Sequence, residues 1–169
     1  MGAPRPSHGQ RPFALLLHGG DQIYADEVVD AHPLARAWAD GRNPAADPAE
    51  LAGLSGALLD AYAERYLALL AQPEIAHVAA RIPSLAMWDD HDIVDGWGSL
   101  RPERLDSPVG RTLFAAARAA FLVFQLGEAP DRVPPIGLDP SGPACRSACG
   151  SRASTSSRRI SAPSAGRTG

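Results

Sequence analysis

Apolar and polar positions follow one another in blocks that predict two short strands and three main helices. Residues 13–18 (FALLLH) form an apolar run that stops at two glycines, which predicts a strand buried on both faces, as in parallel sheets. Residues 84–88 (SLAMW) form the second candidate strand. A short helical stretch is expected between them, ending near His32.

Helical periodicity is clearest in residues 48–72. The sequence DPAE at residues 47–50 supplies an N-cap, a proline at the first helical position and a glutamate at the third. Residues 73–80 predict a short second helix, and residues 108–126 predict a third, capped by Ser107 and ended by Gly127. The apolar face of the first helix consists of Leu51, Leu54, Leu58, Leu59, Tyr62, Tyr66, Leu69 and Leu70.

The order strand, helices, strand, helix is a βαβ pattern, which predicts an α/β fold with parallel strands and a right-handed crossover. In such a sheet the carboxyl ends of parallel strands lie at one edge, and ligands bind there. The segments that follow the two strands are therefore expected to lie side by side, although many residues separate them.

Both of these segments are acidic: GGDQIYAD (residues 19–26) and DDHDIVDG (residues 89–96). Neighbouring carboxylates repel one another unless a cation lies among them. Hard cations prefer oxygen ligands, and two metals ~3.5–4 Å apart can share a carboxylate and lower the pKa of a bound water. A metal site is therefore expected at this edge. The alternative for either segment alone is an acidic turn in water.

Composition and charge limit the classes of function that the chain can have. The chain has 169 residues, 45% of them hydrophobic, and a formal net charge of −3, which suits a globular domain. Residues 143–169 contain five arginines and no acid, so residues 1–142 carry a charge of −8. A body of that sign suits cations and excludes a nucleic-acid or anionic-membrane surface. No G-x-S-x-G motif is present, which argues against an α/β hydrolase with a serine nucleophile.

The chain divides into three expected parts. Residues 1–12 are a flexible lead-in rich in Pro and Gly, and residues 13–142 form the domain. Residues 143–169 form a Ser/Arg-rich tail with one large aliphatic residue, Ile160, and are expected to be disordered. The tail is either a genuine flexible segment or GC-rich coding read out of frame. With no signal peptide or membrane span recognised, we expect a cytoplasmic location.

The two acidic motifs, GDQIYAD (residues 20–26) and WDDHDIVDGW (residues 88–97), together resemble those of the alkaline-phosphatase-D-like (PhoD-type) phosphatases of the calcineurin-like metallophosphoesterase superfamily. The resemblance covers roughly residues 13–140. It implies a four-layer αββα sandwich and metal-dependent hydrolysis of phosphate mono- or diesters. It also implies a dinuclear or multinuclear site that contains iron with calcium or another divalent cation.

The resemblance also implies residue roles. Asp21 would bridge two metals, Tyr24 would be a phenolate ligand, and Asp90 would be a further ligand. His91 would be catalytic, either stabilising the transferring phosphoryl group or protonating the leaving oxygen. The alternatives are a turn residue at Asp21, a core ring at Tyr24 and a hydrogen-bonded structural histidine at His91.

The neighbouring residues are given smaller roles. Asp89 and Asp92 are expected to cap a helix or support the ligands, and the resemblance leaves the role of Asp95 open. Trp88 and Trp97 are expected to pack around the site and shield it.

Two parts of the family pattern are missing: a ligand-bearing strand before residue 13 and the histidines of later strands. We therefore expect a partial sandwich that lacks strands at both ends, with weak or no phosphatase activity in this chain. Open sheet edges would favour self-association. The expected partner is a small-molecule phosphate ester. The alternative function is a non-catalytic fragment that at most binds a cation or a partner.

Overall fold

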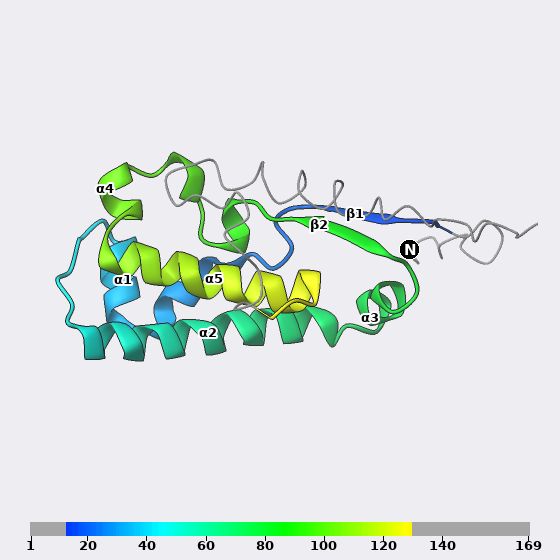
Figure 1. The fold of residues 1–169 in the computed structure, drawn as a ribbon, viewed down its shortest axis with the longest axis horizontal. Coiled ribbons are helices and arrows are strands. Elements are labelled where there is room, and N and C mark those ends of the chain that lie inside the picture. The colour runs from blue at the N-terminus through cyan, green and yellow to red at the C-terminus, as the bar shows by residue number, and fades with distance from the viewer. Residues whose placement is uncertain (1–12, 130–169) are drawn as a thin grey trace, which may run out of the picture.

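The computed structural model describes residues 13–129 (Figure 1). The expected lead-in (residues 1–12), the end of the expected domain (residues 130–142) and the expected tail (residues 143–169) lie outside the described residues. The described part is a mixed α/β structure that is mostly helical, with one two-stranded sheet.

The sheet consists of β1 (Leu16–Gly19) and β2 (Ser84–Met87), which pair in parallel with Leu17 beside Leu85. This pairing confirms the predicted parallel α/β arrangement. The prediction that the first strand is buried on both faces is wrong, because the relative exposure of Leu17 is 70%. Leu85 of β2 is also exposed, at 41%. Helices α2, α3 and α5 lie on one side of the strands, and no described helix covers the other (Figure 1).

The predicted long helices are present. The first is α2 (Pro48–Leu70), and the carboxylate of Asp47 accepts hydrogen bonds from the N–H groups of Ala49 and Glu50. The Glu50 carboxylate in turn accepts from the Asp47 N–H, which completes a capping box. Four side chains of the predicted apolar face are buried: Leu54, Leu58, Tyr62 and Tyr66.

The other predicted helices are α3 (Pro73–Ala79) and α5 (Pro108–Leu126). The Ser107 hydroxyl caps α5 by accepting from the Gly110 N–H, and Gly127 ends the helix with φ +63°. Among the helices of residues 13–129, α5 is the one that is long and apolar enough to cross a membrane, by length and composition alone. Half of it is buried inside the molecule, as expected of the core helix of a soluble domain.

Five short helical segments join these elements. The first two follow β1 and carry the chain toward α2, and the other three lie between β2 and α5. They are η2 (Ala25–Ala31), α1 (Pro33–Ala39), η3 (Asp90–Asp92), η4 (Trp97–Ser99) and α4 (Pro102–Leu105). The sequence predicted a single helical stretch in the first region.

The hydrophobic core lies where α2 packs on α5, directly beneath the segment that follows β2. Trp88 is fully buried, with its ring centroid 5.5 Å from that of Phe114 and 5.0 Å from that of Phe121. Trp97 is also buried and stacks on Phe114. Both tryptophans pack in the core, so the acidic segment between them is anchored to the core at both ends. That they shield the site stays a prediction.

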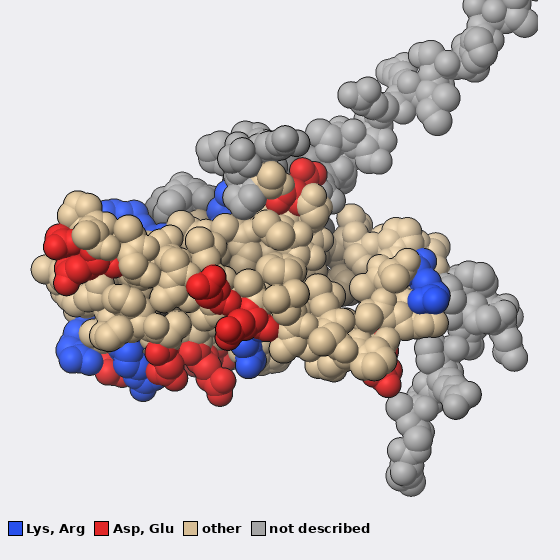
Figure 2. Space-filling view, turned by 90° about the horizontal axis from the view of Figure 1, so that it is seen from below, with Lys and Arg blue, Asp and Glu red and all other residues tan. Residues whose placement is uncertain are grey.

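Surface charge is mixed on the face shown in Figure 2. Arginines form small separate groups between carboxylates, and no broad basic patch covers the described part of that face. Exposed charges among the described residues also form pairs, including Arg36 with Asp30 and Arg42 with Asp40, at 2.9 Å in each case. Exposed pairs of this kind contribute little to stability.

Candidate metal centre

The loops after β1 and β2 lie against each other, as the sequence predicts for parallel strands. Gly20 makes the contact possible: its φ is +104°, and a Cβ at this position would lie 2.6 Å from the Cβ of Asp89. Only glycine tolerates both the backbone conformation and the close approach. Asp21 and Tyr24 also have positive φ, at +55° and +44°. The first acidic loop is therefore tightly bent where it meets the second.

A buried carboxylate joins the two loops. Asp92 is 1% exposed, and its Oδ1 accepts hydrogen bonds from the N–H groups of Gln22 (2.7 Å) and Ile23 (3.3 Å). Its Oδ2 accepts from the Asp89 N–H at 3.1 Å. Burial raises the pKa of Asp92, and these backbone donors oppose that rise. Asp92 therefore joins the two loops. It also completes a capping box at the start of η3 with Asp89, the N-cap residue, and this confirms the expected capping role of both residues.

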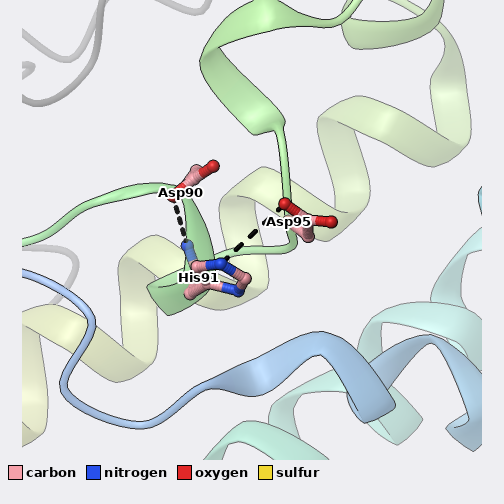
Figure 3. A group of neighbouring side chains, drawn as sticks. All are labelled: Asp90, His91 and Asp95. Atoms are coloured by element: carbon pink, nitrogen blue, oxygen red, sulfur yellow. Dashed lines mark hydrogen bonds and ion pairs between the residues drawn. The ribbon is translucent and has the colours of Figure 1, made fainter.

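The carboxylates of Asp21, Asp89 and Asp90 each offer an oxygen within 4.8 Å of the others. A second group under the same limit consists of Asp90, His91 and Asp95, which Figure 3 shows close together on the loop after β2. Asp21 and Asp90, 69 residues apart in sequence, thus meet as predicted. Asp90 is the residue common to both groups, whereas the resemblance gave the bridging role to Asp21.

The donor set suits a hard cation. One oxygen of Asp21, Oδ1, is buried and has no hydrogen-bond partner among residues 13–129. A buried carboxylate oxygen without a donor is costly unless a cation balances it. Asp90 accepts from the N–H groups of His91 (3.0 Å) and Gly96 (2.8 Å), which fixes the orientation of its carboxylate while leaving lone pairs free. These oxygens could hold a hard metal ion.

His91 is held by a carboxylate of the other loop. Its Nδ1 lies 2.8 and 3.0 Å from the two carboxylate oxygens of Asp26. Because an ionised carboxylate only accepts, Nδ1 carries the proton of this hydrogen bond. The same Asp26 accepts from the Asp95 N–H at 2.8 Å. The hydrogen bond to Asp26 raises the pKa of His91, and the charges of Asp26, Asp90 and Asp21 raise it further.

Tyr24 lies beside this imidazole. The two ring centroids are 4.9 Å apart, and 54% of Tyr24 is exposed. The alternative reading, in which Tyr24 packs its ring into the core, is therefore wrong. The structure places Asp21, Tyr24, Asp90 and His91 in one region, and their chemical roles stay predictions.

Two residues of this region were missed. Asp26 is the last residue of the motif GDQIYAD, so its charge and its place in the motif could have identified it as a site residue. Arg65 of α2 donates hydrogen bonds to the carbonyl oxygens of Ile23 and Tyr24, and nothing in the periodicity of α2 distinguishes it from a surface residue.

Comparison with known proteins agrees with the geometry. The sequence profile of the PhoD-like phosphatases matches residues 7–125. The uncharacterized protein YGR266W of Saccharomyces cerevisiae is 27% identical over 129 residues, which make up 67% of this chain and 18% of the yeast protein. This chain thus spans less than a fifth of that relative. No solved structure matches the chain. The profile match includes both acidic loops and most of the described residues, and the chain belongs to the PhoD-like phosphatase family.

Proposed function

We propose that this chain supplies the carboxylates of a metal centre and a proton donor for the hydrolysis of phosphate mono- or diesters. PhoD-like phosphatases are metal-dependent, and the chain has acidic and histidine groups that could hold a metal. The closeness of the Asp21 and Asp90 carboxylates supports the proposal, because carboxylates held side by side repel one another unless a cation lies among them.

The residues have distinct roles in this proposal. Asp21, Tyr24 and Asp90 would hold the metals, and Asp89 adds an oxygen to the same group. Iron with calcium or another divalent ion would supply positive charge for the phosphoryl group and lower the pKa of a water. Asp26 holds the Nδ1 proton of His91, so Nε2, which lies 3.8 Å from a carboxylate oxygen of Asp95, is the nitrogen that would donate a proton to the leaving oxygen.

The remaining proposals concern the complete fold, the substrate, the location and the activity. The described residues contain one sheet, and the four-layer sandwich of the superfamily remains our proposal for the complete fold. The proposed substrate is a small-molecule phosphate ester, and the proposed location is the cytoplasm. Activity of this chain alone is expected to be weak, because each group within residues 13–129 that could hold a metal offers three residues.

The test measures bound metal and hydrolysis together. We expect the purified chain to retain iron and a second divalent ion by plasma emission, and to hydrolyse p-nitrophenyl phosphate or its bis-ester slowly. Asp21→Asn and Asp90→Asn should lose both properties. Asp60→Asn, which changes an exposed carboxylate on α2, should keep both. An absence of tightly bound metal in the unmodified chain would contradict the proposal.

The second candidate is a non-catalytic fragment that binds a cation or a partner. The exposed apolar positions Leu17 and Leu85 of the two strands favour the binding of a partner. Stoichiometric metal that depends on Asp21, without turnover of either ester, would support this candidate over the enzyme.

A further inference from the structure

Two residues of the first acidic loop have backbone conformations that L-amino acids avoid. Asp21 and Tyr24 both lie in the left-handed region, and neither is glycine. Such residues persist only where surrounding contacts hold them. The contacts that fix this loop therefore also decide where Asp21 and Tyr24 present their oxygens.

The backbone of this loop is held from two sides. Asp92 accepts from the N–H groups of Gln22 and Ile23, as described above. The guanidinium of Arg65 holds the carbonyls: Nε and Nη2 donate to Ile23 O at 3.2 and 2.8 Å, and Nη2 also donates to Tyr24 O at 2.7 Å. A planar guanidinium can bind two adjacent carbonyls in a fixed direction, which the single ammonium of lysine does less well.

Helix α2 connects this contact to the second loop. One turn before Arg65, the Tyr62 hydroxyl donates to the Ile93 carbonyl at 2.6 Å. Tyr62 is fully buried in the core. One face of α2 therefore contacts the loop that bears Asp21 and the loop that bears Asp90, and sets their separation.

We propose that Arg65 is a positioning residue of the metal centre. By binding the carbonyls of Ile23 and Tyr24 it holds Tyr24 in its left-handed conformation beside His91, and it keeps Asp21 directed at the cation shared with Asp90. This role rests on the proposed function. Arg65 itself does not touch substrate.

The first test measures binding of Mn²⁺, a divalent ion that oxygen ligands accept. Calorimetric titration should show that Arg65→Gln weakens Mn²⁺ binding roughly 10- to 100-fold, the usual effect of losing a residue that orients metal ligands. Arg65→Lys should lie between Arg65→Gln and the unmodified chain. The matched control is Arg81→Gln, because Arg81 also donates to a carbonyl, that of His77 at 3.1 Å, but lies away from the loops. It should bind Mn²⁺ normally.

The second test uses no metal. Because the rings of Tyr24 and His91 lie 4.9 Å apart, the tyrosine ring current shifts the imidazole proton resonances. In Arg65→Gln these NMR shifts should move toward those of Tyr24→Ala, and in Arg81→Gln they should stay unchanged. If Arg65→Gln does not fold, Arg65→Lys takes its place in both tests.

The outcomes separate the two proposals. Failure of the unmodified chain to bind Mn²⁺ would refute the metal centre, and the metal-free NMR shifts would then decide whether Arg65 orders the loop. Unchanged Mn²⁺ affinity in the Arg65 variants of a chain that binds the ion would overturn the positioning role. A fall in affinity without movement of the His91 resonances would overturn it as well.

Discussion

The contact between Asp26 and His91 controls the protonation of the imidazole. Replacing Asp26 with Asn removes the charge and keeps an oxygen of similar position. We expect Asp26→Asn to lower the pKa of His91, because the hydrogen bond to Asp26 is the largest cause of its rise. An NMR pH titration of the metal-free protein measures this. Signals of His77 on α3 should be the same in both proteins, and a His91 pKa unchanged by the substitution would contradict the assignment.

The same pair predicts a pH-dependent stability. The folded pKa of His91 is raised, so its contribution is fully present below the unfolded histidine pKa of about 6.5 and is lost as pH rises through the folded value. The free energy of unfolding of the metal-free chain should therefore exceed that of Asp26→Asn near pH 6, and the difference should shrink at alkaline pH. Urea denaturation at a series of pH values measures it; a difference independent of pH would count against the charged pair.

Asp92 offers a prediction about the link between the loops. In Asp92→Asn the amide nitrogen replaces one oxygen, so either the Asp89 N–H or the N–H groups of Gln22 and Ile23 face a donor in a buried place. Leaving a buried donor unsatisfied costs about 1–3 kcal/mol, and we expect that loss in urea denaturation. Asp60→Asn is the exposed control. A loss no larger than that of the control would mean that Asp92 does not join the loops.

At the scale of elements, the approach of the two loops depends on Gly20. Gly20→Ala would place a Cβ 2.6 Å from the Cβ of Asp89 and require a φ of +104°. We expect a loss of about 1–3 kcal/mol in unfolding free energy and weaker divalent-ion binding, because the loops must separate. Gly53→Ala is the matched control: it lies within α2 with open space around it, and should raise stability by roughly 0.5–1 kcal/mol.

Sequence reasoning succeeded for elements whose signals are local. The capping box at Asp47 and the apolar period fix α2 within a few residues, and the glycine after α5 marks its end. The short segments α1 and α4 have too few turns to show a period. Strand burial was predicted wrongly because an apolar run does not reveal which layers cover it.

The candidate metal centre shows the same difference between local signals, which the sequence reveals, and contacts that depend on packing. Parallel pairing was enough to bring Asp21 near Asp90, since both follow strands at one edge. Asp26 contacts His91, and Arg65 contacts Ile23. More than 40 residues of sequence separate the two members of each pair. Such contacts depend on how α2 and η2 pack, which neither charge nor spacing encodes. A sequence motif therefore identifies candidate metal ligands more readily than it identifies the residues that hold those ligands in place.

At the scale of the whole molecule, the uncovered face of the sheet should control association. Leu17 and Leu85 are register partners on this face, and Leu15 is also exposed, at 45%. A two-stranded sheet is marginal by itself, and its exposed apolar strands can pair with another chain. We expect the purified chain to self-associate in sedimentation velocity as concentration rises, and Leu17→Lys to shift it toward monomer.

Leu67→Lys separates this effect from a general gain in charge. Leu67 is 57% exposed on α2, so its substitution adds the same charge to an apolar position away from the sheet. It should leave association unchanged. If both variants dissociate the chain equally, added charge and not the strand face is responsible. If the unmodified chain stays monomeric at high concentration, the prediction that the exposed strand face drives association is wrong.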